Sequence, residues 1–201
     1  MMTKVEEGSL FAKLYDFEVL SELPSDGVDV RRFYFPGAQR SGGKDGLIVR
    51  VVPMNAQAWV GVFATGDASG TLLNGVFTCP DDDMVCVVCG GSGYLVHASM
   101  PEWSSEVPVA PITRVLQIAD PKVLVFASFT DLSAWGSDGM RWRTKRLVRD
   151  ELRVTAYDSQ RVSGIGFDPT QSEPVRFSVD LQTGEYEGGS SPEKYKRRTT
   201  S

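Results

Sequence analysis

The feature that most constrains this chain is a succession of short apolar runs, spaced at about ten residues. The runs occupy residues 46–52, 58–65, 71–78, 84–89, 93–98, 112–119, 122–129, 151–157, 161–167 and 174–181. Such runs, in a chain that also holds 20 Gly and 11 Pro, are typical of strands joined by turns. The sequence therefore predicts a mainly β fold. We expect an antiparallel sandwich or a partial propeller-like sheet stack, with one or two short helices.

Two dipeptides predict hairpin turns between these strands. Asn74-Gly75 interrupts the run 71–78, and Asp138-Gly139 precedes the polar–aromatic stretch "MRWRTKRLV". A type I′ turn requires positive φ at both central residues, which Asn, Asp and Gly tolerate best. We therefore expect a hairpin at each dipeptide.

The segment before residue 31 allows two interpretations. Ser9 can cap a short helix whose apolar face includes Leu10, Leu14 and Phe17. The same residues can form a strand, but alternation would then place Asp16 on the same face as Leu14. Because that face mixes polarity, we favour the helix.

The distribution of these signals divides the chain into three parts. Residues 1–30 form an N-terminal segment with a possible short helix, and residues 31–187 form a single β-rich domain. Residues 188–201 lose apolar content and are expected to form a disordered tail. The basic side chains of this tail are Lys194, Lys196, Arg197 and Arg198.

An internal repeat is suggested by two stretches at an offset of 39 residues. Residues 84–103 and 123–142 each open with an apolar strand and end on a tryptophan, Trp103 or Trp142. A period of about 40 residues is typical of propeller blades. The offset does not continue on either side, so the pair is either a partial blade-like duplication or a chance likeness of two hairpins.

Composition and charge limit the classes of partner. Hydrophobic residues at 41% and charged residues at 23% are ordinary for a soluble globular protein. The net charge of −5 argues against nucleic acid or an anionic membrane and permits a basic protein partner. We find neither an apolar run long enough to span a bilayer nor the apolar core of a secretory signal, and three cysteines fit a reducing compartment. We therefore expect a cytoplasmic protein.

The stretch "MVCVVCGGSGYLVH" (84–97) holds two of the three cysteines and the only histidine. Cys86 and Cys89 have the outline of a zinc-binding C-x-x-C turn, with Cys79 and His97 as further candidate ligands. In a strand, however, residues three apart face opposite sides and cannot share a metal. We therefore expect buried free thiols and no cofactor, and keep as the alternative a structural or hydrolytic zinc site built on these four residues.

Signals for catalysis are weak. The sequence contains neither G-x-S-x-G nor a phosphate-binding G-x-x-x-x-G-K-[ST] motif, and a cysteine nucleophile would depend on His97 as its base. The acidic run Asp81-Asp82-Asp83 lacks the alternate spacing of a calcium loop and reads as a charged hairpin end. We therefore favour a protein that is not an enzyme.

The polar–aromatic hairpin around Asp138 is the candidate binding site. Trp and Arg are enriched at binding hot spots, and this stretch combines both residue types on alternating faces of a strand. The candidate partner- or ligand-binding residues are Trp135, Asp138, Arg141, Trp142 and Arg143. The hairpin is also similar to the Asp-box turn of sialidase-type propellers, although it lacks the spacer residues of that motif.

The C-terminal half contains a wider outline of turn and strand residues. It reads Ala134-x-Gly136-x-Asp138-Gly139-x-x-Trp142, then Phe177-x-Val179-Asp180-Leu181-x-Thr183-Gly184-x-x-x-Gly188-Gly189. In this respect the stretch from Val123 to Gly189 resembles a set of bacterial proteins of unassigned function. The resemblance implies a β-rich bacterial protein and supplies no activity.

The functional hypothesis is therefore a non-catalytic cytoplasmic binding or protein-interaction module. One form is an immunity-type protein that covers a basic partner. Two alternatives remain: the zinc protein described above, and a small-ligand or carbohydrate binder that uses Trp135 and Trp142. Exposure of both tryptophans in one concavity would favour the second alternative.

Overall fold

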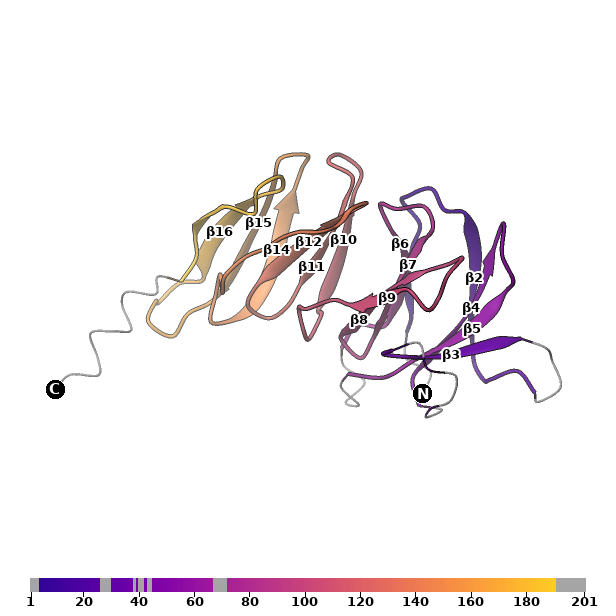
Figure 1. Ribbon diagram of the computed structural model, residues 1–201. Coiled ribbons are helices and arrows are strands. Elements are labelled where there is room, and N and C mark those ends of the chain that lie inside the picture. Colours follow the sequence, from indigo (N-terminus) through magenta and orange to yellow (C-terminus); the bar gives the residue numbers. More distant parts are fainter. Residues whose placement is uncertain are drawn as a thin grey trace.

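The computed structural model describes residues 4–25, 30–37, 39, 42, 45–66 and 72–190. Within these residues the chain forms 17 strands in four sheets and no helix, which confirms the mainly β prediction (Figure 1). It follows that no described residue belongs to a helix that could cross a membrane. The basic side chains of residues 194–198 lie outside the described residues.

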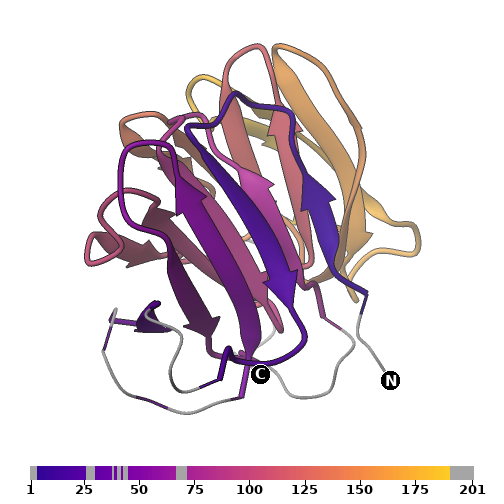
Figure 2. The same ribbon diagram turned by 90° about the vertical axis from the view of Figure 1, so that its right-hand side faces the viewer.

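The first sheet has the strand order β2-β4-β5-β3, and β3 runs parallel to β5 while the other pairs are antiparallel. Its strands are β2 (Tyr15–Leu20), β3 (Arg31–Phe35), β4 (Leu47–Pro53) and β5 (Trp59–Phe63). Figure 2 looks onto this sheet, with the other three behind it.

The helix expected after Ser9 is wrong, because this segment contains β2. Tyr15, Phe17 and Val19 alternate toward the core, while Leu10 and Leu14 are 52% and 41% exposed. Burial therefore follows a period of two, and pairing with β4 satisfies the backbone of β2. Since β1 also pairs with β6, the N-terminal segment contributes strands to two sheets.

The second sheet has the order β1-β6-β7-β8-β9, in which β1 is parallel to β6. Its strands are β1 (Glu6–Gly8), β6 (Gly75–Thr78), β7 (Met84–Cys89), β8 (Ser92–His97) and β9 (Ser104–Glu106).

The hairpin expected at Asn74-Gly75 is wrong, since Gly75 already lies in β6 opposite Val88. A Cβ on Gly75 would lie 2.6 Å from the Phe77 ring, so the glycine permits close packing. The tight turn falls between β7 and β8, where Gly90 and Gly91 both have positive φ.

The third and fourth sheets are antiparallel meanders in chain order. The third contains β10 (Arg114–Ile118), β11 (Val123–Ala127), β12 (Leu132–Gly136) and β13 (Gly139–Arg143). The fourth contains β14 (Asp150–Tyr157), β15 (Arg161–Phe167), β16 (Val175–Asp180) and β17 (Tyr186–Gly188). The hairpin expected at Asp138-Gly139 is confirmed: it joins β12 to β13, and Gly139 has a φ of 104°.

The offset of 39 residues relates the second and third sheets. β10 begins 39 residues after β6, and β11 begins 39 residues after β7. The two stretches that carry the repeat therefore lie at equivalent positions in successive sheets. This placement favours the blade-like interpretation over a chance likeness of two hairpins.

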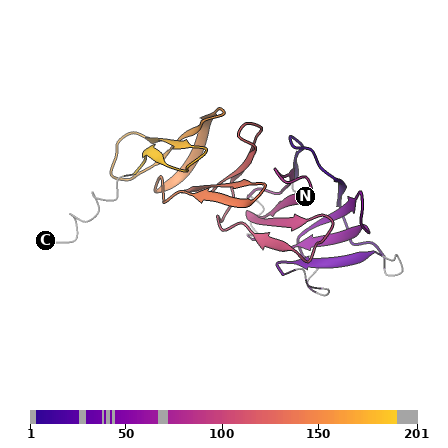
Figure 3. The same ribbon diagram turned by 45° about the horizontal axis from the view of Figure 1, so that its top comes forward.

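The four sheets stack face to face in chain order, and each junction is an apolar core (Figures 1 and 3). Trp59, Phe63 and Val87 belong to the core between the first and second sheets. Cys86, Leu124 and Phe126 belong to the next core, and Val125, Trp142 and Phe177 to the last. The outer face of the first sheet is covered by its own chain, with Leu20, Leu23, Val30 and Tyr34 packed on Ile48, Val60 and Val62.

The core between the second and third sheets gives a direct test of this stacking. Phe126 in β11 is fully buried there, whereas Phe129, three residues later, is 42% exposed. We expect Phe126→Ala to lower the free energy of unfolding by about 3–5 kcal/mol, and Phe129→Ala by less than about 1 kcal/mol. Urea unfolding of both variants measures the difference, and similar losses would contradict the stacking.

Candidate functional site

The two tryptophans of the predicted hairpin site lie in different cores. Trp142 is buried between the third and fourth sheets, where its Nε1 donates to the carbonyl of Leu181 at 2.8 Å. Trp135 is half-buried against the core between the second and third sheets. The two rings do not share a concavity, so their placement does not favour the small-ligand or carbohydrate alternative.

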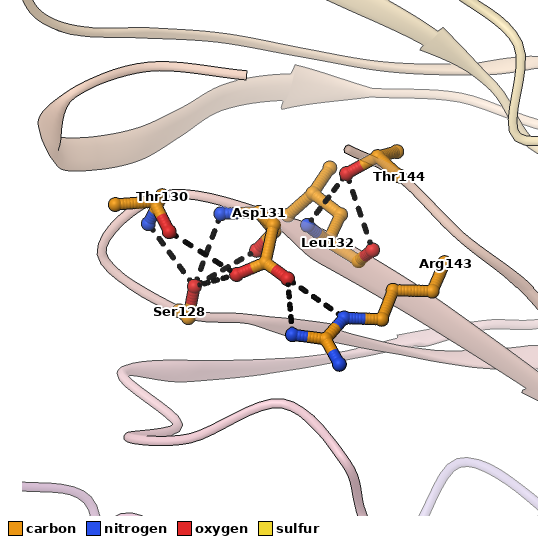
Figure 4. A network of polar contacts seen from close by, with 6 residues as sticks. All are labelled: Ser128, Thr130, Asp131, Leu132, Arg143 and Thr144. Atoms are coloured by element: carbon orange, nitrogen blue, oxygen red, sulfur yellow. Dashed lines mark hydrogen bonds and ion pairs between the residues drawn. The ribbon is translucent and has the colours of Figure 1, made fainter. Parts of the chain in front are cut away.

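The charged residues of the same hairpin are also separated. Asp138 is exposed at the tip, where its carboxylate accepts a hydrogen bond from Ser137 at 3.1 Å. The Arg141 guanidinium lies against the backbone of Gly136. A Cβ added to Gly136 would be only 2.3 Å from Arg141 Nε. Arg143 points to Asp131, at the other end of the sheet (Figure 4).

Asp131 is the centre of a polar network that sequence reasoning missed (Figure 4). Its carboxylate accepts a hydrogen bond from Arg143 Nε at 2.8 Å and forms an ion pair with Arg143 Nη2 at 2.8 Å. It accepts further bonds from the hydroxyls of Ser128 and Thr130. The Ser128 hydroxyl in turn accepts from the backbone N–H groups of Thr130 and Asp131, each at 3.0 Å. The network closes the β11–β12 connection and ties it to β13, so we assign Arg143 a structural role. The spacing of Ser128 and Asp131 is the only local signal for it.

The cysteines of the zinc alternative face two different cores. Cys86 belongs to the core between the second and third sheets, and Cys89 to the core between the first and second. Burial raises the pKa of the Cys79 and Cys86 thiols well above their ordinary value, and all three cysteines are free. Within the described residues, no three His, Cys, Asp or Glu side chains are placed to hold a metal ion together.

His97 contacts a carboxylate and not a thiol. Its Nδ1 lies 3.7 Å from Asp83 Oδ2, and the same carboxylate accepts bonds from the backbone N–H and the hydroxyl of Ser99. In the register of β7 and β8, His97 opposes Met84, while Cys89 opposes Ser92 at the far end. The Ser99 hydroxyl donates to Asp83 and not to His97, so this cluster lacks the nucleophile–base bond of a hydrolase.

The stack has a strongly acidic end, formed by connections that leave alternate strands. These are residues 9–14, 54–58, 79–83, 98–103, 119–122, 137–138, 158–160 and 181–185. They are described throughout, and they carry eight acidic side chains against two lysines, Lys13 and Lys122. The acidic residues are Asp81, Asp82, Asp83, Glu102, Asp120, Asp138, Asp158 and Glu185. We call this surface the acidic end; it runs along the upper side of the molecule in Figure 1.

Contacts between sheets hold these connections on one side. The backbone N–H of Leu14 donates to the carbonyl of Asp82 at 2.8 Å, which joins the first two sheets. The Gln117 side chain donates to the carbonyl of Thr78 at 2.9 Å, which joins the second and third. Trp142 donates to Leu181 between the third and fourth. The acidic end is therefore a product of the stacking.

The opposite end has a balanced charge. Its fully described connections are residues 90–91, 107–113, 128–131, 144–149 and 168–174. Within them the basic Lys145, Arg146 and Arg149 match the acidic Asp131, Asp168 and Glu173 in number. Among the fully described connections, charge is therefore distributed unevenly between the two ends.

Two turns at the acidic end stabilise the ionised form of an aspartate carboxyl through backbone hydrogen bonds. Backbone N–H groups of Gln160 and Arg161 donate to Asp158 and lower the pKa of its carboxyl. Backbone N–H groups of Thr183 and Gln182 do the same for Asp180, at the end of β16. The same hydrogen bonds order the turns and stabilise their negative charge.

Comparisons with known proteins provide no family for this chain. No protein-family model matches it, and no curated protein matches it. Among solved structures, it is similar to the N-terminal domain of Nup159, with 13% identity and a TM-score of 0.39 over 98% of this chain and 57% of that one. It is also similar to a chain of the S. cerevisiae complex of a dbp5 variant with nup159, a gle1 variant, IP6 and ADP. There the identity is 14% and the TM-score 0.39, over 97% of this chain and 55% of that one.

The chain therefore spans little more than half the length of the solved chains it resembles. Neither likeness bears on what this chain binds.

The Asp131 network predicts a structural effect of substitution. We expect Asp131→Ala to lower the free energy of unfolding by about 2 kcal/mol, because the change leaves Arg143 without its acceptor and Ser128 with only the backbone carbonyl of residue 131. Asp138→Ala, at the exposed tip of the same sheet, is the control and should change it by less than about 0.5 kcal/mol. Urea unfolding at neutral pH checks both, and an unchanged midpoint for Asp131→Ala would show that the network is dispensable.

The lowered pKa values of Asp158 and Asp180 predict sensitivity to acid. A carboxyl whose pKa is lower in the folded state stabilises the fold above its ordinary pKa of 3.8, and this stabilisation is lost as the pH falls through the folded value. We expect the urea midpoint to fall between about pH 5 and about pH 3.

The double variant Asp158→Ala/Asp180→Ala should have a lower midpoint at neutral pH and a shallower pH dependence. Asp120→Ala, in another connection of the acidic end, serves as the control and should keep the steep dependence. Equal slopes for the double variant and the unchanged chain would refute the assignment.

Proposed function

We propose that this chain is a non-catalytic cytoplasmic binding module whose acidic end covers a basic protein partner. An immunity-type protein is one form of such a module. The observation that carries the proposal is the charge of the acidic end: eight acidic side chains against two lysines in its fully described connections, while the opposite end is balanced. The free, buried state of all three cysteines supports a reducing compartment.

An asymmetric charge of this kind favours association with a cationic surface. Summed carboxylates on one side attract a basic partner over a distance of the order of the Debye length and orient it during approach. The same field repels nucleic acid and anionic lipid. Most connections of the acidic end are short, so we expect little backbone rearrangement on binding.

The alternatives receive no comparable support from the placement of their residues. Cys86 and Cys89 face different cores, so a zinc site on them would require β7 to be rebuilt. Trp135 and Trp142 also face different cores, so a sugar could not stack on both. Neither arrangement offers an open site of the kind that the acidic end presents.

A labelled peptide of alternating Ser and Lys tests the proposal on the full chain. We expect Asp82→Lys/Asp120→Lys/Glu185→Lys to abolish its binding, because each exposed carboxylate becomes a repelling charge. The matched control is Asp45→Lys/Glu106→Lys/Glu173→Lys, which makes the same change in net charge toward the opposite end and should retain most of the affinity.

Fluorescence anisotropy at low and at physiological salt measures both variants. Affinity for the unchanged chain should fall as salt rises. Equal losses in the two triple variants would mean that only the net charge matters, and the proposal would then be wrong.

A further inference from the structure

Five large apolar side chains are exposed within the acidic end, all on connections of the first and second sheets. One is Leu10, at 52%. The other four are Leu14, Met54, Met100 and Trp103, with exposed fractions of 41%, 72%, 44% and 64%. We call these four side chains the apolar centre. Leu14 lies in the connection 9–14 and Met54 in the connection 54–58, while Met100 and Trp103 share the connection 98–103.

A chain of backbone hydrogen bonds links these connections through the acidic run. Met54 N–H donates to Leu14 at 2.9 Å, and Leu14 N–H donates to Asp82 at 2.8 Å. On the other side Ala98 N–H donates to Asp83 at 2.7 Å, and His97 N–H to Trp103 at 3.0 Å. The backbone that carries the apolar centre is therefore joined by hydrogen bonds to the backbone of the acidic run at residues 81–83.

Trp103 is held in place although its ring is exposed. Its backbone N–H donates to Met100 at 2.8 Å, and its ring meets the edge of the His97 ring at a centroid distance of 5.9 Å. The neighbouring Glu102 is paired with Arg31 at 2.8 Å, which ties this connection to the first sheet. An exposed but ordered tryptophan can bury its area against a partner without first losing much conformational freedom.

Two carboxylates next to the apolar centre, those of Asp81 and Asp82, are available to a cation. The Asp83 carboxylate instead accepts hydrogen bonds from Ser99 and faces His97. Lys13 precedes Leu14, whose backbone N–H donates to Asp82, and it is already paired with Asp16 at 2.7 Å. The Asp82 carboxylate is exposed. Asp81 accepts a hydrogen bond from the backbone N–H of Asp83, which leaves its negative charge in place.

We propose that the apolar centre docks a cationic amphipathic protein segment, with apolar side chains on Trp103 and the two methionines and basic side chains on Asp81 and Asp82. The inference rests on the proposed function and names the chemistry of its partner. Exposed apolar area alone would suit many occupants. The carboxylates that adjoin it select one whose apolar side chains are flanked by Lys or Arg. Methionine side chains adapt to the shape of such a segment, and tryptophan supplies the area of a hot spot.

The test compares two labelled peptides on the full chain. One consists of Leu and Lys patterned as an amphipathic helix, and the other has Ser in place of every Leu, with the same length and charge. We expect the Leu–Lys peptide to bind at least about tenfold more tightly, because only it can bury apolar area against Trp103. Titration calorimetry measures the two affinities, and the emission of Trp103 should shift to shorter wavelength.

Three variants locate the effect. Trp103→Ala and Met54→Ala should each remove most of the difference between the two peptides, while binding of the Ser–Lys peptide stays unchanged. Met140→Ala is the matched control: Met140 is 50% exposed beside the hairpin tip of the third sheet, away from the apolar centre, and its loss should have no effect.

The outcomes separate the two proposals. Equal binding of both peptides would overturn the apolar centre and leave the acidic end as a purely electrostatic surface. A difference that survives in Trp103→Ala and Met54→Ala would also overturn it. Failure of both peptides to bind at low salt would contradict the proposed function itself.

Discussion

Burial of both faces of the inner sheets is the constraint on which the rest of this structure depends. The residues of β7 alternate between two cores, with Val85, Val87 and Cys89 on one side and Cys86 and Val88 on the other. β11 is divided in the same way. Two-sided burial explains why these strands read as continuous apolar runs, and why the C-x-x-C spacing places its thiols apart. It also leaves the inner sheets little to offer a partner except their ends.

Strand positions could be predicted from the sequence because two-sided burial leaves a strong compositional trace. The N-terminal segment could not, because its outcome depends on a partner strand far along the chain: β2 pairs with β4, and β1 with β6. Asn74-Gly75 misled for a related reason. Its glycine is required by the close approach of the Phe77 ring and not by a turn. The sequence cannot distinguish these two reasons for a glycine, and only the packed structure does.

The candidate site was harder to predict than the fold, because its residues are distant in sequence. The sequence correctly indicates that the acidic run at residues 81–83 is a charged turn between strands. The run alone does not indicate a binding surface. Its significance comes from the stacking, which places seven other connections at the same end. The hairpin around Asp138 attracted attention through Trp142 and Arg143, yet the first fills a core and the second supports the Asp131 network. Trp103 gave no sequence signal beyond its place in the repeat, because a lone tryptophan in a turn does not show its exposure.

Charge and stability are coupled at the acidic end, and this coupling decides which residues can report on binding. Asp158 and Asp180 accept backbone N–H groups, so their removal changes the turns as well as the charge. Asp83 likewise orders Ser99. The exposed carboxylates of Asp82, Asp120 and Glu185 have no such hydrogen bond among the interactions of the described residues, so their charge can be reversed with little expected effect on the fold. In such a surface the hydrogen-bonded carboxylates maintain the shape of the turns, and the exposed carboxylates attract the partner. Substitutions in the second set should therefore affect binding before they affect folding.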